Sequence, residues 1–277
     1  MKGLPIWVIL LNFAKLFITG DCTSTQDQVL SILVRTEEHA IIARNISSKY
    51  ETVLWSPASP EHIGAGTEVH LYVPANNLRN VTNQLLTHKL RYDVILDNAQ
   101  DLVEMQTRNV PTDPRISVSY YERYHSLEDI YFWINKTAVD HPDMVKVILI
   151  GSSYEKNPLY VVKLSGRQDG AQKTAMWIDC GIHAREWISP AFCLWFVQYS
   201  LTFYNQNSEI TSMLDQMDIY VLPVMNPDGY KYTWTTNRMW RKNRSQSKNS
   251  YCIGTDLNRN FDANWCSKLD IISIPLH

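Results

Sequence analysis

The sequence lacks an excess of positive charge. Its 26 lysines and arginines stand against 28 aspartates and glutamates, and the formal net charge is −2. Proteins that bind nucleic acid through its phosphates usually carry a basic field, so this balance argues against that class of partner. Beyond residue 20 there is also no apolar run long enough to span a membrane, and no internal repeat or low-complexity tract. We therefore expect neither nucleic acid nor a membrane as a partner.

The composition is that of a folded chain. Of the 277 residues, 45% are hydrophobic and 19% are charged, which allows a substantial core. This length suits one large domain or two modest ones.

The first residues have the pattern of a secretory signal. Lys2 supplies a positive start, an apolar run follows from Leu4 to Ala14, and Ile18-Thr19-Gly20 offers a cleavage end. A membrane anchor is the alternative, but the run is too short to span a bilayer and Lys15 interrupts it. The pattern predicts a signal peptide over residues 1–20 and a secreted, extracellular product.

Secretion changes how the cysteines are interpreted. In an oxidising compartment disulfides are expected, and an odd number of cysteines needs an explanation. The five cysteines are Cys22, Cys180, Cys193, Cys252 and Cys266. Cys22 lies at the signal boundary, so it either leaves with the signal or stays as a lone thiol.

Secretion also turns attention to asparagines that can carry N-linked glycans. The pattern Asn-X-Ser/Thr occurs at Asn45, Asn80, Asn135 and Asn243. Because Asn243 stands inside a basic motif, we predict glycosylation at Asn45, Asn80 and Asn135.

The segment from residue 26 to 100 is predicted to form a small unit of strands and helices. Strand patterns cover residues 29–34, 52–55, 69–73 and 92–96, and helical patterns cover residues 37–49 and 77–88. The resulting order βαββαβ is the ferredoxin-like split arrangement.

A linker-like segment follows a helical stretch over residues 98–108. Residues 109–117 are polar and contain two prolines and one arginine, Arg115. Prolines keep such a segment extended, and exposed extended segments are where proteases cut. An ordinary linker is the alternative, but the position between two foldable units favours an activation cleavage.

From residue 118 onward the pattern predicts a larger α/β domain. Helices are expected over residues 126–139, 187–204 and 210–217, and strands over residues 145–150, 159–163, 176–180 and 218–225. The last of these strands is almost continuously apolar, which suits a strand buried on both faces.

A histidine and a glutamate follow the strand predicted over residues 176–180. His183 and Glu186 are three positions apart, so an imidazole and a carboxylate on one turn can reach the same zinc ion. Loops that follow strand ends in α/β sheets collect active-site groups. Taken alone the pair is weak evidence, because a surface ion pair would have the same spacing.

The neighbouring residues strengthen the zinc interpretation. His183-Ala184-Arg185-Glu186-Trp187 after a buried strand resembles the signature of the metallocarboxypeptidase A/B family. Further matches stand in the same order: Tyr124 to Leu127, Asn237 to Ser245 and Gly254 to Phe261. The resemblance covers roughly residues 25 to 266. It implies an α/β protein with a ferredoxin-like α+β propeptide, residues 21–115, and the first half of a mixed-sheet α/β peptidase domain, residues 116–277.

The resemblance also implies a role for each matched residue. His183 and Glu186 would bind Zn²⁺, and Asp256 would orient the His183 ring. Arg241 would stabilise the oxyanion that forms on the attacked carbonyl. Arg185 would line an outer subsite. The terminal carboxylate of the substrate, which is the C-terminus of a peptide or protein, would be held by Asn258 and Arg259. For a single arginine, a solvated surface charge is the alternative.

Two further implications concern processing. Cys180 and Cys193 match a pair that is bridged in B-type members of the family, whereas Cys252 and Cys266 match cysteines whose partners lie further along. These two would be orphans here or would pair with each other. Arg115 falls where the zymogens of the family are cut, so a trypsin-like protease is the expected activator.

The resemblance stops after Cys266. The tail from residue 267 does not match the family, and the third zinc ligand and the general-base glutamate are expected beyond that point. His277 is the one histidine after Glu186 and is a poor substitute in a terminal tail. We therefore expect a secreted zymogen of a zinc carboxypeptidase that removes C-terminal, basic residues, with a truncated and inactive chain that binds zinc weakly or not at all. A non-catalytic secreted fragment and an unstable product are the alternatives.

Overall fold

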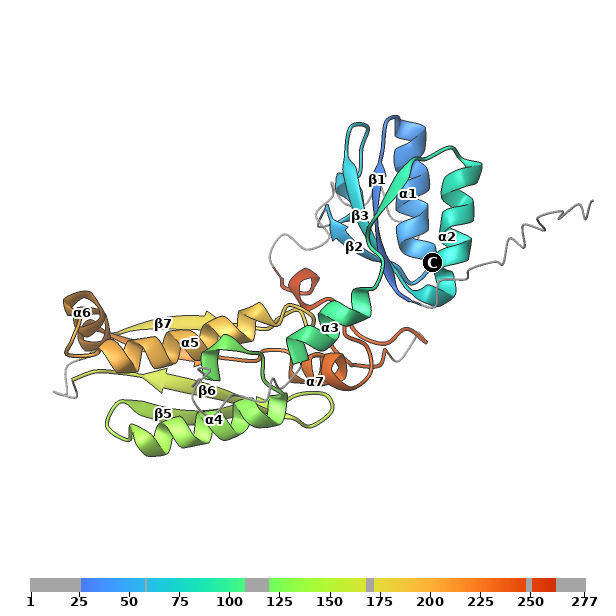
Figure 1. The fold of residues 1–277 in the computed structure, drawn as a ribbon. Coiled ribbons are helices and arrows are strands. Elements are labelled where there is room, and N and C mark those ends of the chain that lie inside the picture. Colours follow the sequence, from blue (N-terminus) through green and yellow to red (C-terminus); the bar gives the residue numbers. More distant parts are fainter. Residues whose placement is uncertain (1–25, 58, 108–119, 168–171, 248–250, 263–277) are drawn as a thin grey trace, which may run out of the picture. The chain divides into compact units, whose positions relative to one another are not determined.

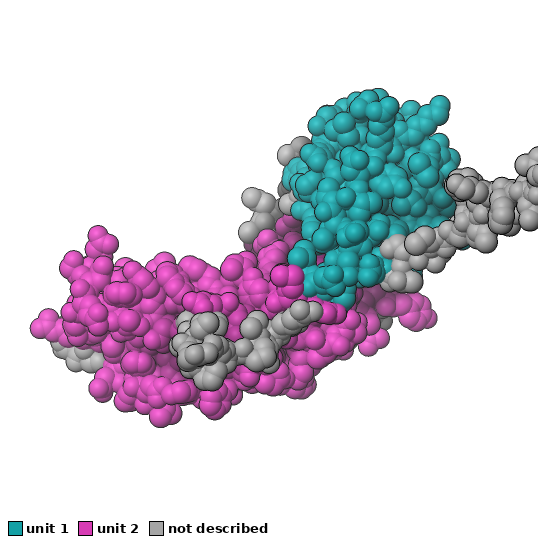
Figure 2. All heavy atoms as spheres, in the orientation of Figure 1, with its two compact units in different colours: residues 1–102 teal, residues 103–277 magenta. Residues whose placement is uncertain are grey.

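The computed structural model describes residues 26–57, 59–107, 120–167, 172–247 and 251–262. Its contacts divide the chain into two compact units, residues 1–102 and 103–277 (Figure 2). Several predicted features lie outside the described residues, namely the signal peptide over residues 1–20, Cys22, Arg115, Cys266 and the tail from residue 267. None of the described helices is long and apolar enough to cross a membrane.

The first unit confirms the ferredoxin-like prediction. Its elements are β1 (Gln28–Leu33), α1 (Glu37–Lys49), β2 (Val53–Ser56), η1 (Pro60–His62), β3 (Glu68–Val73), α2 (Ala75–Thr87) and β4 (Tyr92–Leu96). The four strands pair antiparallel in the order β2-β3-β1-β4, with α1 and α2 on one face of the sheet (Figure 1).

Local signals position the helices of this unit. The Thr36 hydroxyl accepts a hydrogen bond from the backbone N–H of His39, 3.2 Å away, and so caps α1. On α2, Leu78, Val81 and Leu85 recur at helical spacing and are buried. They pack with strand residues such as Leu30, Ile32, Val69 and Leu71 in one core cluster.

The second unit contains a mixed sheet. Its elements are η2 (Tyr120–Glu122), α4 (Leu127–Asp140), β5 (Val145–Ser152), β6 (Pro158–Leu164), β7 (Thr174–Asp179), α5 (Ile188–Phe203), α6 (Ser208–Gln216), β8 (Met217–Leu222), α7 (Pro227–Thr235) and η3 (Leu257–Arg259). The strand order is β5-β6-β8-β7, in which β7 and β8 run parallel and the other pairs run antiparallel. The boundary between the units falls within α3 (Ala99–Thr107).

The strand predicted over residues 218–225 is too long. It ends at Leu222, because Pro223 has no N–H to donate to a ladder and the chain then turns toward the end of β7. Met225 N–H donates to the Cys180 carbonyl at 2.8 Å, and Asn226 N–H donates to the Gly181 carbonyl at 3.2 Å. The expected burial on both faces is also wrong in part, since Ile219 and Val221 are buried but Tyr220 between them is half-exposed.

The core of the second unit lies between the sheet and the helices α4 and α5. Leu127, Ile130 and Ile134 of α4 share one cluster with residues of α5 and of the sheet, among them Leu194, Val197, Val162 and Ile219. At the edge of the sheet, β7 pairs with β8 alone among the described strands. Its residues Met176 and Trp177 are 45% and 51% exposed, so this edge strand presents apolar side chains.

Candidate active site

The site begins with a sharp turn after β7. Gly181 has φ 69° in the left-handed region, and a Cβ at this position would lie 3.0 Å from Cγ of Pro190. Its N–H donates to the Ser189 hydroxyl at the start of α5, 2.9 Å away. The turn thus needs glycine, and it brings residues 182–187 over the end of the sheet.

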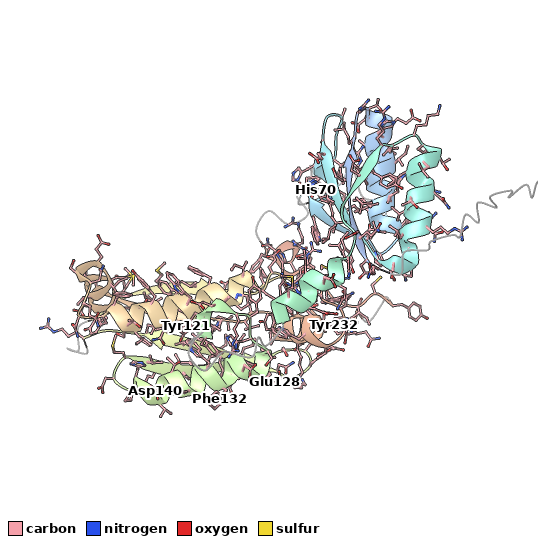
Figure 3. All side chains as sticks on the ribbon, viewed as in Figure 1. His70, Tyr121, Glu128, Phe132, Asp140 and Tyr232 are labelled. Carbon is pink, nitrogen blue, oxygen red and sulfur yellow. A yellow bond between two sulfur atoms is a disulfide. The ribbon has the colours of Figure 1, made fainter. Side chains whose placement is uncertain are left out.

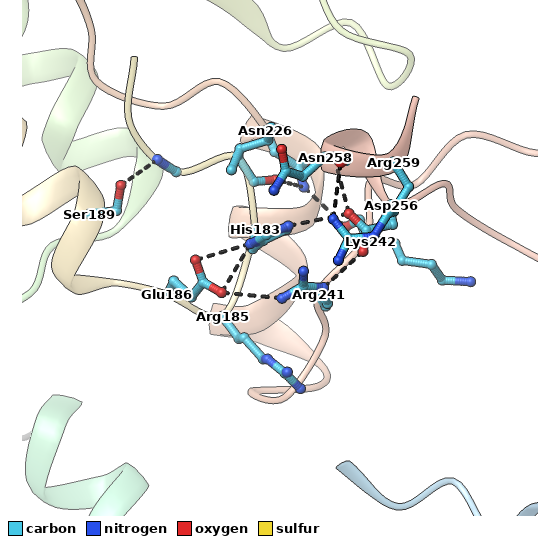
Figure 4. A network of polar contacts seen from close by, with 12 residues as sticks. His183, Arg185, Glu186, Ser189, Asn226, Arg241, Lys242, Asp256, Asn258 and Arg259 are labelled. Carbon is cyan, nitrogen blue, oxygen red and sulfur yellow. Dashed lines mark hydrogen bonds and ion pairs between the residues drawn. The ribbon is translucent and has the colours of Figure 1, made fainter. Parts of the chain in front are cut away.

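This turn places His183 and Glu186 beside each other (Figure 4). Nδ1 of His183 lies 3.0 Å and 3.1 Å from the two carboxylate oxygens of Glu186. The Glu186 N–H donates to the His183 carbonyl at 3.2 Å, which closes the turn. The imidazole is buried and the carboxylate is half-exposed. The predicted spacing therefore brings the two side chains together.

Asp256 meets the other side of the same imidazole ring. Its Oδ1 lies 3.2 Å from Nε2 of His183, and its Oδ2 accepts a hydrogen bond from Nε of Arg241 at 3.0 Å. Arg241 also donates from Nη1 to Glu186 at 3.3 Å, so its guanidinium bridges the two carboxylates. Burial opposes ionisation of Asp256, but the hydrogen bond and charge of Arg241 outweigh it and lower the pKa of Asp256.

The donors present fit part of a zinc site. Two donors about 2.1 Å from one tetrahedral zinc ion lie about 3.4 Å apart, which is close to the His183–Glu186 separation. Asp256 cannot join that ion because it faces the opposite nitrogen, where a carboxylate fixes the tautomer of a metal-binding histidine. Among the described residues, no group of three or more His, Cys, Asp or Glu side chains is arranged to hold a metal.

The residues predicted to bind the substrate lie around this pair. Asp256 caps η3, accepting from the Asn258 N–H at 3.1 Å, and Nη1 of Arg259 donates to the Asn258 carbonyl at 3.2 Å. Arg185 follows His183 on the turn, where burial and then the charge of Arg241 lower the pKa of its guanidinium. The structure brings Asn258, Arg259 and Arg185 to the same polar network around His183 (Figure 4).

Asn226, which was not predicted as a site residue from the sequence, joins the two loops of the site. Asn226 is buried, and its Nδ2 donates to the carbonyls of Ile182 at 3.2 Å and Lys242 at 3.1 Å. Its Oδ1 accepts from the Gly229 N–H at 3.1 Å and so caps α7. A Cβ at Gly229 would lie 2.4 Å from the Lys242 carbonyl oxygen, so this contact requires glycine. Asn226-Pro227 is an N-cap followed by proline at N1, a signal that predicts α7.

A second missed element lies beneath the turn. The buried indole of Trp187 stacks on Trp234 with ring centroids 4.2 Å apart, and the Arg238 guanidinium carbon lies 3.7 Å from its centroid. Two groups this close to the Trp187 ring would collide if both lay on the same face of it, so Trp187 lies between Trp234 and Arg238. Arg238 Nη1 also donates to the Arg185 carbonyl at 2.8 Å, and burial lowers the pKa of Arg238 to about 10. Arg238 thereby holds the turn that carries His183 and Glu186 against the Trp187 ring.

Processing sites are visible in part. Cys180 and Cys193 are joined in a disulfide between the end of β7 and α5. Asn45, Asn80 and Asn135 are exposed on α1, α2 and α4. Asn243 differs, because its Oδ1 accepts hydrogen bonds from Ser245 N–H, Ser245 Oγ–H and Thr255 N–H, the last at 2.7 Å. These contacts give Asn243 a structural role in its loop.

Comparison with known proteins identifies the family. The model of the zinc carboxypeptidase family matches residues 130–275, and that of the carboxypeptidase activation peptide matches residues 30–106. The chain belongs to the zinc carboxypeptidase family. Its carboxypeptidase region begins within α4 and includes the whole of the candidate site.

Carboxypeptidase relatives resemble most of this chain. Carboxypeptidase B2 of Rattus norvegicus is 51% identical over 269 residues, which is 97% of this chain and 63% of the relative. Carboxypeptidase B2 of Homo sapiens is 50% identical over 242 residues, 87% of this chain and 57% of the relative. The crystal structure of thrombin activatable fibrinolysis inhibitor is similar with a TM-score of 0.79 at 51% identity, over 87% of this chain and 60% of that one. The chain thus spans about three-fifths of these carboxypeptidases.

Proposed function

We propose that the chain is a secreted zymogen of a zinc carboxypeptidase that removes C-terminal residues, preferably basic ones, from peptides and proteins. The observation that carries this proposal is the arrangement around His183, with Glu186 on Nδ1, Asp256 on Nε2 and Arg241 bridging both carboxylates. The preference for basic residues is supported by the identity to carboxypeptidase B2.

Each residue of the site has a task in this proposal. His183 and Glu186 would hold the zinc ion, which when bound would polarise the scissile carbonyl and make water a stronger nucleophile. Asp256 keeps the proton of His183 on Nε2, so that Nδ1 presents its lone pair. Arg241 donates hydrogen bonds to the oxyanion that develops on the carbonyl.

The carboxylate of the substrate is bound by a separate group of residues. Arg259 has a planar guanidinium that matches a carboxylate with two parallel hydrogen bonds, and Asn258 adds an amide donor. Arg185 lines an outer subsite, where its guanidinium donates hydrogen bonds to the peptide backbone of the substrate. A C-terminal carboxylate is thereby distinguished from an internal peptide bond.

Activation requires removal of the first part of the chain. The match to a carboxypeptidase activation peptide over residues 30–106 supports a zymogen. We propose a signal peptide over residues 1–20, an activation peptide over residues 21–115 that a trypsin-like protease releases after Arg115, and a peptidase region over residues 116–277.

A second candidate function is binding without catalysis. It is favoured by the zinc donors, because the described residues offer two protein ligands and a catalytic zinc ion takes three. No general-base glutamate is assigned among the described residues, and we propose that these residues by themselves bind a peptide C-terminus without cutting it. An unstable product without function is the remaining alternative.

One set of measurements separates these candidates. Purified protein is treated with trypsin and mixed with a peptide ending in arginine, while zinc content is determined by mass spectrometry. Stoichiometric zinc with chelator-sensitive release of arginine would exclude the non-catalytic fragment. The variant R115Q is the matched control, because it removes the proposed activation cleavage while the same treatment is applied.

Binding tests the site when there is no turnover. We expect the peptide with a free C-terminal carboxylate to bind and its C-terminally amidated form to bind at least ten-fold more weakly, since the amide carries no charge for Arg259 (about 1.4 kcal/mol or more). Equal affinity for both forms would show that the carboxylate site is wrongly assigned. R259A should remove the difference, and R79A on the first unit should leave it unchanged.

A further inference from the structure

The outer face of α4 carries an apolar stripe with an asparagine in its middle. Phe132 is 71% exposed and Val139 is 77% exposed, both far more than such side chains usually are. Asn135 is exposed between them, at i+3 from Phe132 and i−4 from Val139. Residues at these spacings are neighbours on one helix face. Figure 3 marks Phe132 and Asp140 along this helix.

Ion pairs lie beside the apolar stripe and do not cover Phe132 or Val139. Lys136 pairs with Asp140 at 2.5 Å along one side, and Glu128 pairs with Lys231 of α7 at 2.8 Å at its N-terminal end. The other face of α4 is committed to the core through buried residues such as Ile130 and Ile134. Phe132 and Val139 therefore lie outside the core cluster to which the other face of α4 belongs.

Asn135 begins the sequon Asn135-Lys136-Thr137. In the helix its Nδ2 donates to the Tyr131 carbonyl at 2.9 Å, which uses one of its two N–H groups and leaves the other for substitution. Thr137 is only 5% exposed. An enzyme that reads the threonine must therefore meet this segment before α4 packs, as happens when a chain enters the secretory pathway.

We propose that an N-linked glycan on Asn135 covers Phe132 and Val139. This proposal rests on the secretion that the proposed function includes. A bond forms between Nδ2 of Asn135 and the anomeric carbon of the first sugar, and the bond from that carbon to a lipid-linked diphosphate donor breaks. The diphosphate is the leaving group, Nδ2 loses one proton, and nothing is oxidised or reduced.

The chemistry of the sugar suits this surface. An N-linked glycan is bulky and strongly hydrated, so its outer part keeps water at the surface of the helix. The C–H faces of its first sugar can lie against the Phe132 ring, as apolar groups do against aromatic faces. The glycan thus removes the two side chains from water and makes the stripe soluble.

The sequon on α2 provides an internal comparison. The neighbours of Asn80 at helical spacing are polar, namely Asn76, Asn77, Asn83 and Gln84. A glycan there has no apolar side chain to cover, although Asn80 is exposed like Asn135. Loss of a glycan should therefore have different consequences at the two sites.

The first experiment measures which asparagines are modified. The 277-residue chain is produced in secreting animal cells, treated with an amidase that converts glycosylated Asn to Asp, and digested for mass spectrometry of peptides. We expect conversion at Asn135. Secreted protein with Asn45 or Asn80 converted and Asn135 intact would overturn the proposal. Protein that is retained with every sequon intact would overturn it together with secretion, whereas the zinc and arginine-release measurements would stand.

The second experiment tests what the glycan covers. N135Q and T137V both remove the sequon, while K136R keeps it and N80Q removes the comparison site. We expect binding of a dye for apolar surface to rise at least two-fold in N135Q and T137V relative to K136R and N80Q. In N135Q the additional changes F132S and V139S should return it to the starting level. An equal rise in N80Q, or a rise that persists with both serines, would show that the glycan does not cover this stripe.

Discussion

The two units differ in the composition of their edge strands. In the first unit, the edge strand β2 has four residues, and β4 carries Asp93 next to the exposed Val94 and Ile95. In the second unit, exposed Met176 and Trp177 line β7, and Ile188, Phe192 and Trp195 of α5 are exposed as well. In the unit that carries the candidate chemistry, the edge strand thus has no charged residue directly beside Met176 and Trp177, whereas Asp93 stands beside Val94 in β4. A sheet can position a site although it leaves an edge open.

The largest expected effect comes from separating the units. We expect residues 21–107 to fold alone with one cooperative thermal transition, because their core is formed within the unit. Residues 116–277 should fold poorly and associate, because apolar side chains remain exposed. Calorimetry and size-exclusion chromatography measure both. A sharp transition of monomeric 116–277 would remove the contrast.

A pair of core variants sharpens the comparison within the intact chain. W187A should destabilise the second unit by about 3–5 kcal/mol, since it removes a buried indole packed between Trp234 and Arg238. L71A should destabilise the first unit by about 2–5 kcal/mol. In calorimetry each variant should lower one transition and leave the other unchanged. A shift of both transitions in either variant would mean that the units unfold together.

The predictability of the fold follows the same division. In the first unit the strands alternate and the helices have apolar residues at helical spacing, so local pattern was enough to predict βαββαβ. In the second unit, the strand predicted over residues 218–225 ends early. Pro223 was a signal in the sequence that the prediction overlooked, whereas the contact of Met225 with the Cys180 carbonyl depends on tertiary structure. A continuous apolar run does not tell where a strand leaves its sheet.

The grouping of the side chains in the candidate site was predictable from the sequence, and the residues that support them were not. His183, Glu186, Asp256 and Arg241 stand in motifs, and the structure brings them into contact. Asn226 and Arg238 act through carbonyl oxygens of residues far away in the sequence. No spacing rule connects such pairs. The Asn226-Pro227 cap was the signal available for α7.

Zinc binding tests the proposed metal site, which only the second unit carries. D256N should weaken zinc binding by about 10–100-fold, because the amide no longer accepts the Nε2 proton as a carboxylate does. H183A should abolish specific binding. D140N on α4 is the matched control, since its pair with Lys136 is remote from the site. Equal zinc affinity of D256N and the unmodified chain, measured by calorimetric titration, would contradict the assignment of Asp256.

The open edge can be tested without touching the site. M176K should lower the aggregated fraction of the protein at least two-fold while changing the free energy of unfolding by less than about 0.5 kcal/mol. The same change on the first unit, V94K, should leave aggregation unchanged, although Val94 is exposed too. Light scattering measures the outcome. An equal effect of both lysines would mean that β7 is not the associating edge.

The smallest expected effect concerns pH. Burial lowers the pKa of His125, opposed by its hydrogen bond with the Tyr120 carbonyl. The unfolded chain therefore takes up this proton first as pH falls below about 6.5, and the second unit loses stability until its folded pKa is passed. The free energy of unfolding falls by about 1.4 kcal/mol for each pH unit that separates the folded from the unfolded pKa of His125. H125Q should abolish this step, which denaturant unfolding between pH 7 and 5 would reveal.

The contact between His183 and Asp256 has a consequence for the order in which the chain is made. Asp256 follows His183 by 73 residues. At about 5–20 residues per second, a ribosome needs about 4–15 s to add that many. During this interval Glu186 is already present but the carboxylate that sets the tautomer of His183 is not. A zinc ion that met the chain in this interval would find an imidazole free to present either nitrogen, so the proposed arrangement around His183 is complete only after Asp256 has been added.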